Sequence, residues 1–237
     1  MSDPNELLND RQFLAVAEKT FKTRKVTPMT RGTHPDLMEL YSALCKKRGI
    51  TERPVFVAES AIVNAVAYFP AQAIIISSQV ADHLPQQQVC AAMGHEGGHL
   101  SRRQMLRNFF RLFTAMSVPL DIAGVDAGLR KAGLLSPHSP PVSFAKFMVA
   151  MPLTGLAAIL GVPYANRADE RDCDVAGAEL AGAEAMQGYN LAAATGNREP
   201  SILERIFGNY PSFKDRNRHL ERRFKILPKG EPPLPGR

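Results

Sequence analysis

The chain has 237 residues, of which 45% are hydrophobic and 22% charged, with a formal net charge of +6. This balance is typical of a globular protein with one full hydrophobic core, and it excludes a disordered or fibrous chain. No basic stretch is interleaved with aromatic residues, so we expect no nucleic-acid partner. The three cysteines, Cys45, Cys90 and Cys173, are widely spaced, which predicts free thiols in a reducing compartment.

The first 50 residues are predicted to form a helical N-terminal leader. Residues 5–22 and the segment from Pro35 to about Lys47 both have a helical pattern, and Pro35 suits a first helical turn. Residues 1–13 lack the charged start and apolar core of a signal peptide, so we expect the active domain in the cytoplasm. Residues 51–227 are then the main domain, which opens with strands predicted at 54–58 and 73–77.

A helix is predicted from near Pro85 past Arg103, and it contains the sequence His95-Glu96-Gly97-Gly98-His99. Histidines at i and i+4 share one helix face, so both rings can reach one metal ion. The glutamate between them is placed to contact a water on that metal. The alternative is two exposed histidines and a solvated glutamate. We interpret the two glycines as positions where another backbone or a substrate approaches closely.

A second carboxylate-bearing helix is predicted over residues 166–180. Glu170 and Asp174 share a face of it, at i and i+4. Glu170 would complete a His2Glu metal site, and Asp174 could accept the N–H of a ligating histidine. The alternative is that both are solvated surface acids. Cys173 lies three residues after Glu170, and we expect it to pack as a small buried hydrophobic side chain.

Two apolar segments, 109–125 and 144–163, lie between the two motifs and predict a helical hairpin insertion at about 109–163. Pro119 and Asp121 interrupt the first segment, and the uncharged stretch 147–162 is shorter than the about 20 residues a membrane span needs. A buried or monotopic hairpin is therefore favoured, with an integral membrane hairpin as the alternative. The flanking arginines would hold the active site at the cytoplasmic face. Residues 228–237, rich in proline, predict a mobile tail.

Taken in order, these motifs resemble the HtpX-like and CAAX prenyl protease family of zinc metallopeptidases, which belongs to the gluzincins. That family carries HExxH followed by ExxxD, matched here by His95, Glu96, His99, Glu170 and Asp174. Residues 64–70 resemble its "NAxA" edge strand. Residues 210–216 resemble its "HP…R" element, although Tyr210 stands where many relatives carry histidine.

The resemblance and the site chemistry together imply an α+β fold, mostly helical and zincin-like, with one small β-sheet beside the metal helix. They imply one Zn²⁺ per chain, held by His95, His99 and Glu170, with Glu96 as the general base. Tyr210 or Arg216 would help stabilise the oxyanion, and a polypeptide substrate would lie along the edge formed by Asn64, Ala65, Val66 and Ala67. The function expected is a zinc-dependent metalloendopeptidase, peripheral or monotopic at a membrane. The alternative is a non-catalytic, zinc-containing chaperone-like or membrane-associated binding protein.

Overall fold

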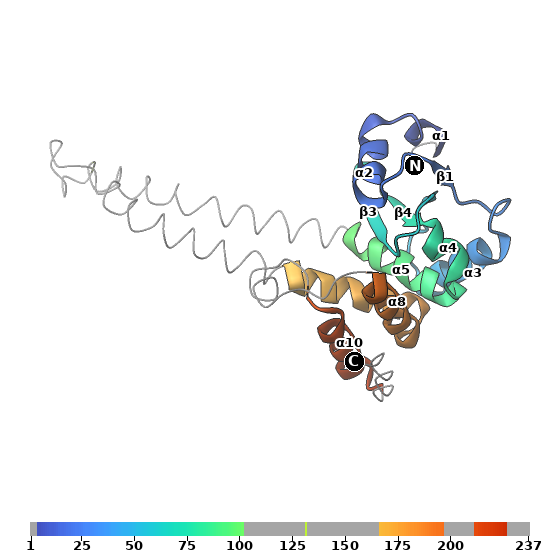
Figure 1. The fold of residues 1–237 in the computed structure, drawn as a ribbon. Helices are drawn as coiled ribbons and strands as arrows, with labels where there is room; N and C mark the ends of the chain where they lie inside the picture. Colours follow the sequence, from blue (N-terminus) through green and yellow to red (C-terminus); the bar gives the residue numbers. More distant parts are fainter. Residues whose placement is uncertain (1–3, 102–130, 132–165, 197–210, 227–237) are drawn as a thin grey trace, which may run out of the picture.

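The computed structural model describes residues 4–101, 131, 166–196 and 211–226 (Figure 1). The two apolar segments 109–125 and 144–163, Tyr210 and the predicted tail 228–237 lie outside the described residues. Among the helices that the structure describes, none has both the length and the hydropathy to cross a membrane.

The segment predicted as helical at 5–22 is divided into two helices, α1 (Pro4–Leu7) and α2 (Arg11–Phe21), and the first 50 residues are not all helical, because they also contain a strand at Val26–Pro28. The chain breaks between the two helices because the Asp10 carboxylate caps α2, accepting a hydrogen bond of 2.8 Å from the Gln12 backbone N–H. The helix ends at Lys22, whose φ of 61° is left-handed. The buried face of α2 carries Phe13 and Phe21.

One sheet of four strands has the order β1-β2-β4-β3. The strands are β1 (Val26–Pro28), β2 (Val55–Ala58), β3 (Ala65–Tyr68) and β4 (Ala73–Ser77). The central pair β2 and β4 is parallel, and the outer strands β1 and β3 are antiparallel to their neighbours. The strands predicted at 54–58 and 73–77 are confirmed. Strand β1 was not predicted, because three residues with a proline carry no readable alternation.

The sheet is covered on both faces (Figure 1). Phe13 and Phe21 of α2 pack with Phe56 and Ile75 on one face. The other face packs against α3 (Pro35–Arg48) and α5 (Gln86–His99), while α4 (Ser78–His83) links β4 to α5. Burial on both faces explains why β4 is apolar at successive positions. Strand β1 and helix α2, which both lie in the first 50 residues, pack with the sheet. The domain boundary expected at residue 50 stays a prediction.

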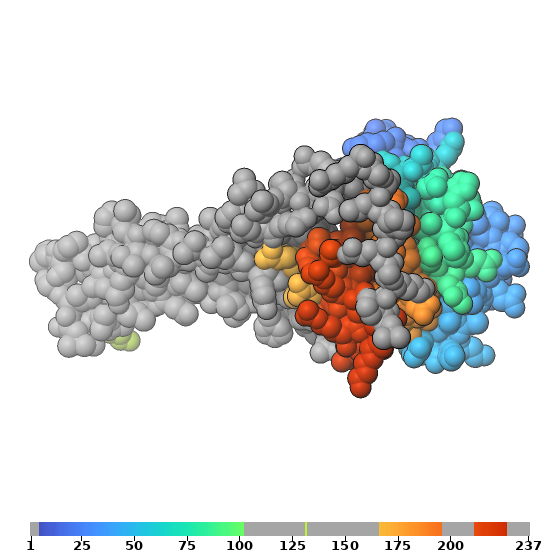
Figure 2. All heavy atoms as spheres, turned by 60° about the horizontal axis from the view of Figure 1, so that its bottom comes forward, coloured from blue at the N-terminus to red at the C-terminus, as the bar shows by residue number. Residues whose placement is uncertain are grey.

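The described C-terminal part is mostly helical. Residues 166–181 form one helix, followed by α8 (Ala183–Gly196) and α10 (Phe213–Phe224). Helix α8 packs against both α5 and α10. The outer face of α10, red in Figure 2, exposes Lys214, Arg218 and Arg222. The mostly helical α+β fold with one small sheet beside the metal helix is thus confirmed.

One boundary was predicted wrongly. Helix α5 ends at His99, not past Arg103. The Ser101 N–H donates to the Gly98 carbonyl three residues back, at 3.1 Å, and this tighter turn closes the helix.

Candidate active site

The candidate site lies where α5 crosses the helix of residues 166–181. Glycines let the two backbones approach closely: a Cβ added to Gly94 would lie 2.9 Å from the Cα of Gly177, and one on Gly98 would lie 3.1 Å from the Cα of Cys173. The predicted close approach of a second backbone is therefore confirmed at Gly98. At Gly97, no atom in the described part of the chain lies within 4 Å of such a Cβ, so the substrate interpretation stays a prediction there.

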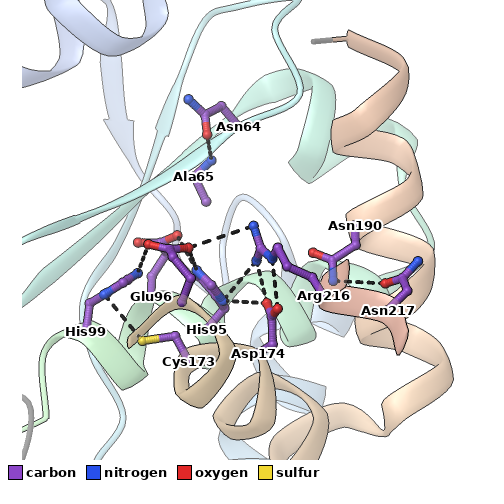
Figure 3. Close-up of polar contacts among 11 residues, drawn as sticks. Asn64, Ala65, His95, Glu96, His99, Cys173, Asp174, Asn190, Arg216 and Asn217 are labelled. Carbon is purple, nitrogen blue, oxygen red and sulfur yellow. Dashed lines mark hydrogen bonds and ion pairs between the residues drawn. The ribbon is translucent and has the colours of Figure 1, made fainter. Parts of the chain in front are cut away.

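The crossing brings the three predicted metal ligands together, and Figure 3 shows two of them, His95 and His99, side by side. The Nε2 atoms of His95 and His99 each lie 3.5 Å from a carboxylate oxygen of Glu170. One ligand atom from each residue can be chosen so that all three lie within 4.8 Å of one another. The two rings are nearly perpendicular, at 81°, with centroids 5.0 Å apart.

This spacing fits a metal ion. Zinc bonds to nitrogen and oxygen are about 2.0–2.2 Å, so tetrahedral ligand atoms lie about 3.3–3.6 Å apart. The Nε2 atom of His95 lies within that range of Glu170 Oε2, and the Nε2 atom of His99 lies within it of Glu170 Oε1, both at 3.5 Å. Two nitrogens and one carboxylate also leave a fourth position open for a water, which is typical of a catalytic metal site.

Glu96 lies beside this group but outside it. It is 6% exposed, and its Oε1 atom is 3.9 Å from the Nε2 atom of His95. It is not one of the three residues that could hold the metal. A carboxylate in this position can contact a water on the metal and accept its proton.

Asp174 contacts the ring nitrogen of His95 that faces away from Glu170. The Nδ1 atom of His95 lies 3.0 Å from Oδ1 of Asp174, which is fully buried. Burial by itself would lower the pKa of His95, but the Asp174 and Glu170 carboxylates outweigh it and raise that pKa to about 9. Burial would raise the pKa of Asp174, but hydrogen bonds from Arg216 and His95 lower it to about 2.

Arg216 reaches the site from α10, whose first turn is capped by the Ser212 hydroxyl accepting from the Asp215 N–H at 3.1 Å. The guanidinium donates from Nε to Asp174 at 2.8 Å and from Nη2 to the second Asp174 oxygen. Its Nη1 atom lies 3.8 Å from Glu170. The sequence predicted Arg216 as a helper of the oxyanion, whereas in the structure its main partner is Asp174.

Sequence reasoning missed one polar contact. Cys173 is buried, and its Sγ atom lies 3.3 Å from Nδ1 of His99. Burial and the neighbouring carboxylates, Glu170 foremost, raise the pKa of its thiol. The expectation that Cys173 packs is confirmed by its burial, and the contact with His99 comes in addition to that packing. The available signal was its i, i+3 relation to Glu170, which places both on one side of the helix.

Strand β3 ends the sheet beside α5, against which it packs. The Ser77 N–H donates to the Asn64 carbonyl at 3.1 Å, so in the alternating antiparallel ladder the backbone groups of Ala65 and Ala67 point away from β4. The Ala65 N–H instead donates to the Asn64 side chain at 2.9 Å (Figure 3). Among the described residues, no further strand pairs with this edge.

Comparisons with known proteins agree with this geometry. Residues 21–224 match the model of peptidase family M48. The chain is 23% identical over 240 residues to "Protease HtpX" of Chromohalobacter salexigens, covering 87% of this chain and 77% of that protein. The fold resembles the crystal structure of S. mikatae Ste24p, with a TM-score of 0.54 and 17% identity over 83% of this chain. The chain spans about half, 51%, of the length of Ste24p. The family model covers most of the chain, so the chain belongs to peptidase family M48 and is a metalloprotease, and His95, His99 and Glu170 form a group that could hold its metal.

Proposed function

We propose that this metalloprotease is a zinc-dependent endopeptidase in which His95, His99 and Glu170 hold one zinc ion. The observation that carries the proposal is the cluster of one ligand atom from each of these three residues, all within 4.8 Å of one another, with each histidine Nε2 3.5 Å from one Glu170 oxygen. Two imidazoles and one carboxylate are a donor set that zinc accepts in catalytic sites. Zinc bound there would polarise a water and the scissile carbonyl.

Side chains of the protein transfer the proton, position the ligands and stabilise the oxyanion. Glu96 accepts the proton of the attacking water on its carboxylate and passes that proton to the leaving amine. Asp174 holds the His95 ring with its Nε2 atom toward Glu170. Arg216 keeps Asp174 in place through two hydrogen bonds. Tyr210, by its match to the family element, is our proposed donor to the oxyanion.

The substrate would bind in extended form along β3. Ala65 and Ala67 are one and three residues beyond Asn64 in the ladder, so both direct an N–H and a C=O outward. An added peptide strand can pair with these groups. Asn64 and Val66 complete the edge, and the Asn64 side chain would exchange its bond to the Ala65 N–H for one to the substrate. Binding through backbone groups suits polypeptides of varied sequence.

The test is cleavage of an unfolded protein such as casein by the wild type and by Glu96→Gln, with zinc content measured in both. We expect turnover to fall by about 10²–10⁴-fold, because a general base is lost while the ligands remain. The matched control is Glu179→Gln, which alters an exposed glutamate on the helix of residues 166–181. It should cleave like the wild type. Equal measurable turnover by Glu96→Gln would remove Glu96 as the general base. The absence of turnover in the wild type at full zinc occupancy would instead favour the non-catalytic binding protein.

We also propose that the 109–163 segment contacts the cytoplasmic face of a membrane in a peripheral or monotopic manner. The support is its sequence, in which Pro119 and Asp121 interrupt the first apolar segment and the second is short. Carbonate should then release at least part of the protein from membranes. Complete retention after carbonate, with labelling from the far side of cysteines introduced near residue 130, would show that the segment spans.

A further inference from the structure

The two histidines of the site direct the same ring nitrogen, Nε2, toward Glu170, but their other ring nitrogens, Nδ1, contact different residues. Each directs Nε2 toward the Glu170 carboxylate, at 3.5 Å, which leaves Nδ1 on the opposite side of the ring. A neutral imidazole carries one N–H, so binding a metal through Nε2 requires the proton to be on Nδ1. Each ring therefore needs an acceptor behind it to fix this tautomer.

Behind His95 the acceptor is the Asp174 carboxylate, at 3.0 Å. Behind His99, the sulfur of Cys173 lies 3.3 Å from Nδ1, and the dashed line in Figure 3 marks this contact. Cys173 is not one of the residues whose ligand atoms cluster at the metal position. It therefore acts on the ring from the side away from the metal.

We propose that Cys173 is a positioning residue, whose sulfur accepts the Nδ1–H of His99 and so keeps Nε2 of His99 available to the metal. The inference rests on the proposed zinc site. Sulfur is a weaker acceptor than a carboxylate, so the two histidines are held unequally. His99 is also the more exposed of the two, at 28% of its side chain against 5% for His95.

The position of the sulfur is constrained by the helix crossing. A Cβ on Gly98 would lie 3.2 Å from Sγ and 3.1 Å from Cα of Cys173, so the thiol is packed tightly against the last turn of α5. His99 is the neighbour of Gly98 on that turn. The same close approach that brings the helices together therefore holds the sulfur at the back of the ring.

The experiment compares Cys173→Ala, Cys173→Ser and the control Cys90→Ala in the full-length chain. Cys90 is a fully buried thiol on α5, near the start of the helix, so its replacement reproduces the loss of a buried sulfur. Zinc affinity is measured by competition with a chelator. The ring N–H protons of the two histidines are observed by NMR after loading with Co²⁺, which shifts them away from other signals.

We expect Cys173→Ala to lower zinc affinity by about tenfold, the lower end of the range for lost histidine partners. We also expect the His99 ring N–H to exchange faster with water in this variant. Cys173→Ser keeps a hydrogen-bonding atom and should restore part of both properties, while Cys90→Ala should change neither. Equal affinity and equal N–H exchange in Cys173→Ala and Cys90→Ala would overturn the inference. If the wild type binds no zinc, the proposed function itself fails, which is a distinguishable result.

Discussion

Replacing Gly94 with alanine should show how strongly the site depends on the helix crossing. A Cβ at this position would lie 2.9 Å from the Cα of Gly177 and 3.0 Å from the Cβ of Leu180. Ordinary carbon–carbon contacts are about 3.5–4.0 Å, so the helices must separate by about 0.5–1 Å. The matched control is Gly97→Ala on the same helix, where a Cβ meets no atom within 4 Å in the described part of the chain.

The two variants should change the free energy of unfolding in opposite directions. Overpacking a tight interface costs about 1–3 kcal/mol. Alanine in place of glycine in a helix contributes up to about 1 kcal/mol of stability. Gly94→Ala should therefore be less stable than the wild type by up to about 2 kcal/mol, and Gly97→Ala more stable by up to about 1 kcal/mol. The zinc affinity of Gly94→Ala should also fall, because separation of the helices moves Glu170 away from both histidines.

The assay is chemical denaturation with a chelator present, so that metal binding does not contribute to the measured stability. Zinc affinity is then measured separately for each variant by competition. If Gly94→Ala matches Gly97→Ala in both stability and zinc affinity, the close crossing does not determine the geometry of the site, and the reasoning is refuted.

Three further predictions concern the ligands. Glu170→Gln should lose the bound zinc, measured as metal content after dialysis; unchanged stoichiometry and affinity would remove Glu170 from the site. Asp174→Asn should lower zinc affinity by about 10–100-fold while keeping the fold by circular dichroism, because His95 loses its charged partner; a variant with wild-type affinity would contradict this. The pKa of His95 is raised to about 9 in the absence of metal, so below that pH a proton competes with zinc. Zinc affinity should therefore rise as pH increases toward 9, by about tenfold per unit for one proton released, and calorimetry in buffers of different ionisation enthalpy would count that proton.

The sequence alone determined the local chemistry of the site. Spacings of four residues place His95 with His99, and Glu170 with Asp174, on single helix faces, because helix periodicity is a local property. The central strands and helix α3 were predicted for the same reason, since their alternation or periodicity can be read within a few residues. Where such local patterns were short, as in β1, the prediction failed.

Only the tertiary structure decided which residues meet across long separations in the chain. Cys173 and His99 are 74 positions apart, and Arg216 and Asp174 are 42 apart, yet each pair is in contact. The first contact depends on how closely α5 approaches the helix of residues 166–181, and hence on whether the space at Gly94, Gly98 and Gly177 is filled. The second depends on where α10 places Arg216. Helix periodicity assigns a side chain to a face, but the partner of that face is chosen by packing over the whole domain. For this reason the candidate ligands and Asp174 could be read from the sequence, while the contacts of Cys173 with His99 and of Arg216 with Asp174 could not.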